Sequence, residues 1–313
     1  MAFKNKLTDI LGIDYPIIQG GMAWVATGEL AAAVSDAGGL GIIGAGNAPA
    51  DIVKEEIKKV KTKTDKPFGV NIMLLSPFAE DIVELVIEEK VPVVTTGAGN
   101  PGKYLDKLKK IGTKVFPVVP SVALAKRMTR LGIDGVIAEG NEAGGHIGQL
   151  TTITLIPQIV DAVDVPVIAA GGIADGRGVL AVMALGAQGV QIGTRFVCST
   201  ECTAHDNYKQ AIINASDRDA VVTGRTTGHP VRNIKNSLTR NMQKLEDRGA
   251  SIEEIERLGS GKLRLAVREG DIAEGSVMAG LAAGFIDDIK PVKDIIEEII
   301  NQAEDVREGL NEL

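Results

Sequence analysis

The chain has 313 residues, of which 44% are hydrophobic and 24% charged, and its formal net charge is −7. This composition predicts a packed core and differs from that of chains that stay unfolded. An acidic chain with only 3% aromatic residues lacks the usual features of a nucleic-acid binder. No apolar run is long enough to span a bilayer and no export signal is apparent, so we expect a cytoplasmic protein without membrane contact.

Eight short runs rich in Val and Ile, several of them ending in Gly, predict eight buried strands. They lie at residues 15–22, 39–46, 68–74, 91–99, 114–121, 135–140, 165–173 and 189–196. Strands that are apolar almost throughout indicate a parallel sheet covered on both faces by helices. Eight such units predict an α/β fold of the (β/α)8 (TIM) barrel type, although an open doubly wound sheet has a similar pattern.

Helical periodicity separates the strands, for example at residues 51–60, 79–88 and 124–131. The chain is roughly 60 residues longer than the about 250 of a typical barrel. The alternation of strands and helices stops after the eighth strand, and helical patterns return at 275–285 and 291–304. We therefore predict a barrel of residues 1–197 and 272–313, with 198–271 inserted before the last barrel helix as a lid over the barrel mouth.

Glycines follow the seventh and eighth strands, where such barrels commonly hold phosphate. The first loop contains Ala170, Gly171 and Gly172, and Asp175 is placed to cap the next helix. The second loop contains Gly193 and Thr194, whose hydroxyl adds a hydrogen-bond donor. Because glycine has no Cβ, a phosphate can approach the backbone amides closely. The pattern favours a phosphate site over simple tight turns.

Residues 39–44 (GLGIIG) match the dinucleotide-binding pattern G-x-G-x-x-G. In that fold the glycines follow a strand and begin a helix, whereas here they lie within a predicted strand. We interpret this match as fortuitous.

Five segments together resemble the FMN-dependent enoyl-acyl-carrier-protein reductases of type II fatty acid synthesis. They are YPIIQGGMAW (15–24), PFGVNIMLLSP (67–77), EGNEAGGHIG (139–148), AAGGIADGRG (169–178) and QIGTRF (191–196). The resemblance extends along nearly the whole chain, and the wider group of flavin barrels also includes the nitronate monooxygenases.

The resemblance implies FMN at the barrel mouth, NADPH or NADH as co-substrate, and a homodimer. It assigns the phosphate to Gly171, Gly172, Gly193 and Thr194. The isoalloxazine-side positions are Gly21, Met22 and Asn71, with Glu139 and Gln191 nearby. It also suggests that Gly97, Ala98, Gly99, Asn100 and Met278 line the substrate side.

His146 follows two glycines after the sixth strand and matches the histidine of that family. Imidazole titrates near neutral pH, so His146 is the candidate catalytic residue, either as a proton donor or as an orienting group. His205 and His229 have weaker claims. Cys198 and Cys202 are too few for a disulfide framework or a zinc site, so we expect packing or surface thiols and no bound metal.

Residues 225–268 carry ten Arg and Lys against five Asp and Glu, in a chain that is acidic overall. Such a basic segment would attract an acidic acyl carrier protein and the phosphates of a nicotinamide cofactor. We therefore predict reduction of a trans-2-enoyl thioester. The alternatives are a nitronate monooxygenase, which passes electrons to oxygen, and a flavin-binding or carrier-binding module without turnover.

Overall fold

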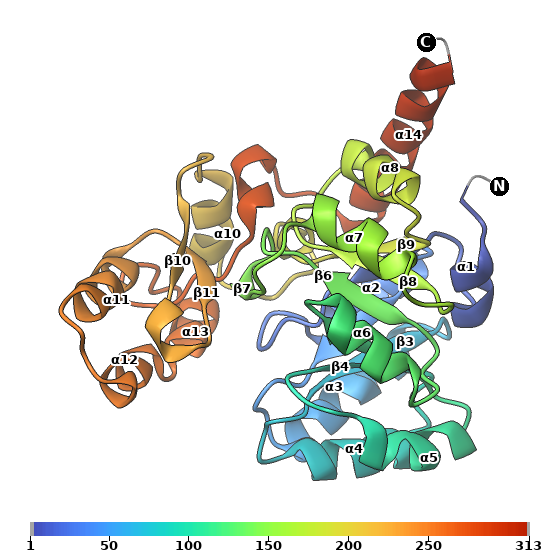
Figure 1. The fold of residues 1–313 in the computed structure, drawn as a ribbon, viewed down its shortest axis with the longest axis horizontal. Helices are drawn as coiled ribbons and strands as arrows, with labels where there is room; N and C mark the ends of the chain where they lie inside the picture. The colour runs from blue at the N-terminus through green and yellow to red at the C-terminus, as the bar shows by residue number, and fades with distance from the viewer. Residues whose placement is uncertain (1–2, 312–313) are drawn as a thin grey trace.

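The computed structural model describes residues 3–311, so residues 1–2 and 312–313 of the predicted barrel lie outside it. Eight parallel strands form one sheet in the order β1-β9-β8-β6-β5-β4-β3-β2. The strands are β1 (Ile17–Gln19), β2 (Gly41–Gly44), β3 (Phe68–Met73), β4 (Val93–Gly97), β5 (Lys114–Val119), β6 (Val136–Glu139), β8 (Val167–Ala170) and β9 (Gly189–Ile192). A parallel bridge between Ile18 and Leu40 joins the two edges. The sheet is therefore a closed (β/α)8 barrel, which confirms the predicted fold and excludes the open sheet (Figure 1).

Side chains from alternate strand positions divide the core into two layers. Ile18, Ile42 and Ile137 belong to a cluster that also contains Leu7 and Leu11 of α1 (Lys6–Leu11). The neighbouring Ile17 and Ile43 instead join the larger cluster between the sheet and its helices. Both layers are fully buried, which explains why the strands are apolar throughout. The G-x-G-x-x-G match lies in and just before β2, as predicted, and the next helix begins only at Ala50.

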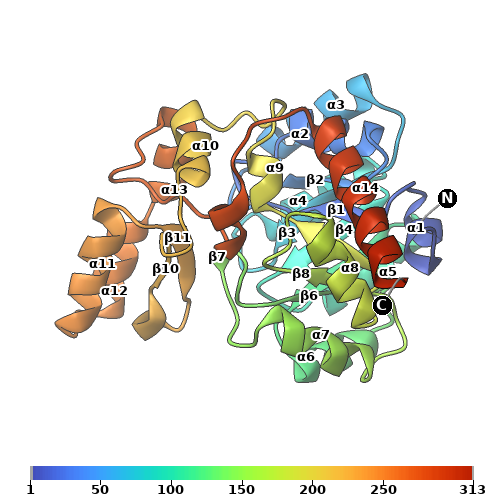
Figure 2. The same cartoon turned by 90° about the horizontal axis from the view of Figure 1, so that it is seen from above.

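Eight helices alternate with the strands around the barrel. They are α2 (Gly28–Asp36), α3 (Ala50–Lys63), α4 (Ala79–Glu88), α5 (Gly102–Lys110), α6 (Val122–Thr129), α7 (Thr152–Val160), α8 (Gly176–Ala184) and α14 (Val292–Asn311). The last of them, α14, packs against α8 and α2 and so completes the ring (Figure 2). None of the helices in the described part of the chain is long and apolar enough to cross a bilayer.

Most of the chain between β9 and α14 forms a lobe beside the barrel, which both views show (Figures 1 and 2). The short helix α9 (Thr194–Val197) follows β9 directly and stays at the barrel. The elements of the lobe are α10 (Asp206–Ile213), β10 (Ala220–Thr223), η1 (Arg225–Thr227), β11 (Val231–Ile234), α11 (Ser237–Asp247), α12 (Ile252–Gly259), α13 (Lys262–Arg264), η2 (Leu265–Glu269) and η3 (Leu281–Phe285). The lobe contacts loops at the carboxyl ends of the barrel strands; Arg264, for example, lies over the ring of Trp24 after β1. Its action as a lid stays a prediction.

The predicted helix at 275–285 is wrong. Met278 instead forms a bridge with Asn233 of β11, and only the five residues of η3 are helical. The small residues of this segment serve close packing: a Cβ on Gly280 would lie 2.6 Å from the carbonyl oxygen of Glu142. A run of Gly and Ala therefore allows an extended segment to pack against the loop after β6.

Candidate active site

The glycine loop after β8 has a backbone that other residues rarely adopt. Gly171 and Gly172 have φ values of +98° and +76°, in the left-handed region. A Cβ on Gly171 would lie 2.9 Å from the carbonyl oxygen of Gly140. The Thr152 hydroxyl, at the start of α7, donates a hydrogen bond of 2.9 Å to the Gly171 carbonyl and so holds the loop in place. As predicted, the Asp175 side chain caps α8 by accepting from the amide of Gly178 at 3.0 Å.

The loop after β9 lies next to it, because Ala170 of β8 pairs with Gln191 of β9. Gly193 is the N-cap of the short helix α9, and a Cβ there would lie 3.5 Å from the Met22 sulfur. The Thr194 hydroxyl accepts a hydrogen bond of 3.0 Å from the amide of Gly280. The structure thus brings the residues of the predicted phosphate site to one end of two neighbouring strands.

The predicted isoalloxazine-side residues also lie together. A Cβ on Gly21 would fall 2.2 Å from the Cβ of Asn71, so only glycine fits beside this side chain. Asn71 Nδ2 donates to the Thr95 hydroxyl at 2.9 Å, which ties the side chain to β4. Its Oδ1 accepts no hydrogen bond from residues 3–311. The Gln191 side chain lies against Gly20, in the loop after β1 that also contains Gly21.

Glu139 ends β6 at the same mouth. Its carboxylate forms no ion pair within the described chain, and burial raises its pKa from an ordinary value of 4.5 to about 7. Removal from water disfavours a charged carboxylate, and here no neighbouring cation compensates. Glu139 is therefore close to half protonated at neutral pH and can act as a hydrogen-bond donor or acceptor.

His146 lies in β7 (Gly145–His146), a two-residue strand that pairs with β11 of the lobe. The residue is exposed at its edge, yet enough of the ring is desolvated to lower its pKa below the ordinary 6.5. Repulsion from His229 lowers the pKa further. The Met278 sulfur would lie 3.5 Å from a Cβ on Gly145, so Met278 and His146 border the same loop.

The other predicted substrate-side residues follow β4 in a tight loop. Ala98 and Gly99 have positive φ values of +52° and +157°. A Cβ on Gly97 would meet nothing within 4 Å, whereas one on Gly99 would lie 2.6 Å from the Cβ of Leu74. The Asn100 side chain accepts from the amide of Gly102 at 2.9 Å, so it stabilises the start of α5. This loop lies at the mouth, but its contacts are with Leu74 and α5 rather than with the His146 loop.

Two residues that position the His146 loop had no role in the sequence analysis. The Glu142 carboxylate accepts from the Thr152 amide at 2.9 and 3.0 Å. Arg232 is 8% exposed and donates to the carbonyl oxygen of Asn141 at 2.9 Å. Glu142 lies within the EGNEAGGHIG motif, whereas Arg232 counted only as one of the ten Arg and Lys of residues 225–268. Only the tertiary pairing of β7 with β11 indicates that Arg232 supports the loop.

Cys198, Cys202 and His205 serve packing and helix capping. Cys198 and Cys202 are buried, which raises the pKa of both thiols and that of Cys198 to about 12. They are packing thiols rather than surface thiols. His205 caps α10, since its Nδ1 accepts from the amide of Asn207 at 3.1 Å. No cluster of metal-binding side chains occurs among residues 3–311.

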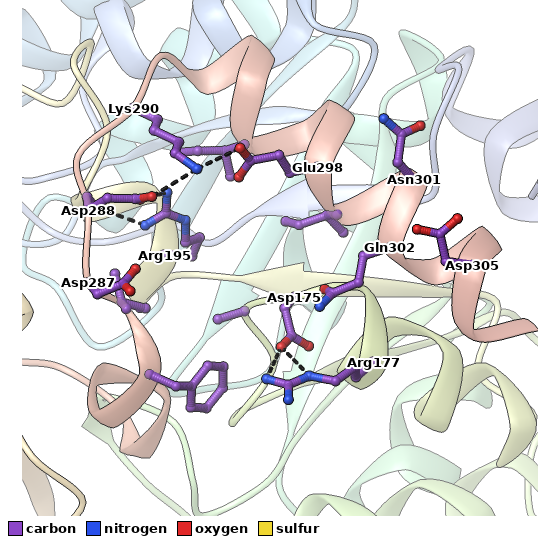
Figure 3. A pocket seen from close by; sticks show the side chains of 15 residues that line it. Asp175, Arg177, Arg195, Asp287, Asp288, Lys290, Glu298, Asn301, Gln302 and Asp305 are labelled. Atoms are coloured by element: carbon purple, nitrogen blue, oxygen red, sulfur yellow. Dashed lines mark hydrogen bonds and ion pairs between the residues drawn. The ribbon is translucent and has the colours of Figure 1, made fainter. Parts of the chain in front are cut away.

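A groove of about 500 Å³ lies outside the barrel, between α8, α14 and the segment that precedes α14 (Figure 3). Arg195 of the QIGTRF motif points into it and pairs with Asp288 at 2.6 Å. Lys290 pairs with Asp288 and Glu298, and Arg177 pairs with Asp175. Because its cations are already paired with carboxylates and it lies outside the ring of strands, between helices, we do not regard this groove as the active site.

Comparison with known proteins agrees with this geometry. The model of the nitronate monooxygenase family matches residues 4–302. The structure of FabK from Thermotoga maritima is 54% identical, with a TM-score of 0.96 and 98% of each chain covered. A "Probable nitronate monooxygenase" of Staphylococcus saprophyticus is 35% identical over 98% of this chain and 99% of its own.

A third relative has another activity in its name. The "(3aS,4S,5R,7aS)-5-hydroxy-7a-methyl-1-oxo-octahydro-1H-indene-4-carboxyl-CoA dehydrogenase" of Rhodococcus jostii is 34% identical, with 96% of each chain covered. Together, the matches confirm the resemblance to the enoyl-acyl-carrier-protein reductases among the flavin barrels. The chain is an oxidoreductase that belongs to the nitronate monooxygenase family.

Proposed function

We propose that this protein is an FMN-dependent enoyl-acyl-carrier-protein reductase that uses NADPH or NADH. The observation that carries the proposal is the 54% identity to FabK, against 35% to the "Probable nitronate monooxygenase" of S. saprophyticus. The match to FabK suggests this reaction. The five segments that resemble the enoyl-acyl-carrier-protein reductases also support the proposal, because they lie in or directly after barrel strands and so belong to the barrel mouth.

The glycine loops fit a flavin phosphate. The left-handed backbone at Gly171 and Gly172 and the missing side chain at Gly193 leave amides accessible at two neighbouring strand ends. The Thr194 oxygen already accepts from Gly280, so its O–H remains able to donate to an anion. When bound, FMN supplies reversible hydride transfer, which no side chain of this protein can perform.

The polar residues at the mouth suit the ring of a flavin. Asn71 offers a free acceptor, and Glu139 offers a carboxyl group that titrates near pH 7. Gly21 leaves room for the Asn71 side chain, Met22 lies next to Gly193, and Gln191 lies next to Gly20. In this proposal these residues orient the isoalloxazine and exclude water from it.

His146 and Met278 border the substrate side. A trans-2-enoyl thioester accepts hydride at Cβ, so negative charge develops on its carbonyl oxygen until Cα gains a proton. An imidazole N–H near that oxygen stabilises the charge. We propose that Gly97, Ala98, Gly99 and Asn100 border the acyl chain from the other side of the mouth.

The lobe supplies a surface for an acidic carrier protein. We use the name basic face for the eight cations of residues 225–268 that are exposed or partly exposed and form no ion pair within residues 3–311: Arg225, Lys235, Arg240, Lys244, Arg257, Lys262, Arg264 and Arg268. None of these cations pairs with a carboxylate of residues 3–311, and the Glu246 carboxylate is occupied by the Gly224 amide. A free cationic surface attracts the acidic carrier that delivers the thioester. The expected homodimer stays a prediction.

An anaerobic stopped-flow experiment tests the reaction. We expect NADPH or NADH to bleach the flavin of the reconstituted protein, and crotonyl-CoA or an enoyl carrier protein to restore its colour. A flavin that stays reduced when the thioester is added would contradict the proposal.

Nitronate oxidation is the second candidate function, favoured by the family match. Oxygen consumption with propionate 3-nitronate, in the absence of NADPH and NADH, would select it. Retained FMN without turnover in either assay would indicate a binding module.

A double variant tests the carrier surface separately. We expect Arg240→Glu with Lys244→Glu to raise KM for the enoyl carrier protein about tenfold, because both charges are reversed. The small substrate crotonyl-CoA provides the control, and its KM should not change. An equal effect on both substrates would contradict the docking role of the basic face.

A further inference from the structure

Residues 277–281, which we call the bridging segment, contact the loops after β6 and β9 at the same time. The Gly280 amide donates a hydrogen bond of 3.0 Å to the Thr194 hydroxyl, in the glycine loop after β9. The next amide, that of Leu281, donates one of 2.9 Å to the carbonyl oxygen of Glu142, in the loop after β6. Gly280 is extended, with a φ of −82° and a ψ of 177°, so these successive amides point to opposite sides of the chain. Because consecutive Cα atoms are only about 3.8 Å apart, the two loops cannot separate without breaking one of these bonds.

The contact between the bridging segment and the loop that carries His146 leaves no room for side chains. A Cβ on Gly144 would lie 2.6 Å from the carbonyl carbon of Ala279 and 2.7 Å from the amide nitrogen of Gly280. Conversely, a Cβ on Gly280 would lie 2.6 Å from the Glu142 carbonyl oxygen and 3.1 Å from the Gly144 nitrogen. Neither glycine has a positive φ, so the contact requires glycine here and the backbone conformation does not.

The lobe holds the bridging segment from the other side. The Tyr208 hydroxyl, in α10, donates to the Met278 carbonyl at 2.8 Å, and Tyr208 is fully buried. The Ile234 amide, at the end of β11, donates to the Val277 carbonyl at 2.8 Å. These bonds make the bridging segment a fixed link between lobe and barrel.

Other contacts hold the loop after β6 in different directions. The Glu142 carboxylate accepts from the Thr152 amide, and the Arg232 guanidinium donates to the Asn141 carbonyl. These contacts connect the loop to α7 and to β11. The bridging segment connects it to the loop after β9, where the flavin phosphate is proposed to bind.

We propose that Thr194 is a positioning residue for His146: through Gly280 and Leu281, its hydroxyl oxygen fixes the loop that carries His146 relative to the glycine loop after β9. The oxygen accepts from Gly280 while the O–H stays able to donate to a phosphate. One side chain thus contacts the cofactor site and also determines where His146 lies. The link between the loops is independent of the proposed reductase, whereas its effect on catalysis rests on that function.

Hydrogen–deuterium exchange of the FMN-free protein tests the link, because the phosphate takes no part there. Thr194→Val keeps the shape of the side chain but leaves the buried Gly280 amide without its acceptor. An unsatisfied buried amide costs more than an ordinary hydrogen bond contributes, so we expect peptides covering 277–285 and 140–147 to exchange roughly tenfold faster. Thr194→Ser keeps the hydroxyl and should restore the wild-type rates.

Gly309→Ala is the control variant, because Gly309 is exposed in α14 and a Cβ there would meet nothing within 4 Å. It should leave exchange in both peptides unchanged. Peptides of α3 and β3 should exchange at the wild-type rate in every variant, which distinguishes a local effect from general unfolding. Unchanged exchange at 140–147 in Thr194→Val, or equal acceleration in Thr194→Ser, would overturn the proposal.

Gly280→Ala tests the consequence for catalysis with the Thr194 hydroxyl intact. The new Cβ would lie 2.6 Å from the Glu142 carbonyl oxygen, so the bridging segment and the loop must move apart. A displacement of about 1 Å can lower a rate about 100-fold. We therefore expect reoxidation of the reduced flavin by crotonyl-CoA to slow roughly tenfold or more, while the affinity for FMN stays within about threefold of the wild type.

Reoxidation of this variant at the wild-type rate would overturn the effect on catalysis. If the wild-type protein itself reduces no enoyl thioester, the proposed function fails. The exchange experiment then still decides whether Thr194 positions the loop that carries His146.

Discussion

Replacing Glu139 by glutamine should make the stability of the FMN-free protein less sensitive to pH. Burial raises the pKa of Glu139 from 4.5 to about 7 in the folded state. The folded protein therefore binds this proton more tightly than the unfolded chain, and its stability falls as the pH rises from 4.5 through 7. A shift of about 2.5 units corresponds to about 3 kcal/mol, the largest difference that the substitution can produce.

Urea unfolding of the wild type and of Glu139→Gln, at half-unit steps between pH 5 and pH 9, measures this effect. The difference in unfolding free energy should increase in favour of the variant by up to about 3 kcal/mol and level off above pH 7.5. Contributions from all other titrating groups cancel in this difference. Glu88→Gln is the control, because Glu88 is an exposed surface carboxylate paired with Lys54.

Two results would refute the reasoning. Stability curves that run parallel from pH 5 to pH 9 would mean that Glu139 is not desolvated in the folded protein. A variant that loses stability at high pH would mean that an unrecognised cation stabilises the carboxylate.

Two further predictions concern the glycine loop and the thiols. Gly171→Ala should weaken FMN binding at least tenfold in a fluorescence titration, because the new Cβ would lie 2.9 Å from the Gly140 carbonyl. Gly112→Ala is the control, because Gly112 also has a positive φ of +82° but a Cβ there would meet nothing within 4 Å. This variant should lose only about 1 to 2 kcal/mol of stability and retain FMN. Equal FMN affinity in both variants would contradict the phosphate site. Cys198 and Cys202 should not react with a thiol reagent at pH 8 until guanidinium unfolds the chain, because both thiols are buried; rapid modification of the native protein would contradict this.

The barrel could be predicted from the sequence because its signals are local. Each strand has an apolar run with glycine or a small polar residue near its end, and each observed strand begins within two residues of the predicted position. The ends of parallel strands meet at one face of a barrel, so the end-of-strand residues Gly171, Gly193 and Glu139 could be grouped without knowledge of their contacts.

The lobe could not be predicted in the same way, because its structure depends on pairing between distant segments. A strand of two residues, such as β7, has no periodicity that distinguishes it from a turn. The segment around Gly280 has a helical pattern in the sequence, yet its small residues allow close contact with the loop after β6. In the sequence, Arg232 was therefore only one cation among ten, and His229 was only a residue of a turn.

The division of the molecule into a barrel and a lobe also explains why relatives with the same fold have names of different activities. The matched proteins include FabK, a "Probable nitronate monooxygenase" and the indene-carboxyl-CoA dehydrogenase of R. jostii, each aligned over at least 96% of this chain. The glycine loops after β8 and β9 belong to the barrel, whereas His146 lies in β7, which pairs with β11 of the lobe, and the Met278 sulfur lies next to Gly145. Changes in those segments are expected to alter the charge and access around His146 without disturbing the glycine loops. The substitutions that convert one activity into another are therefore expected in the lobe, including η3. Exchanging residues 225–234 between two relatives should change substrate preference while FMN affinity stays the same.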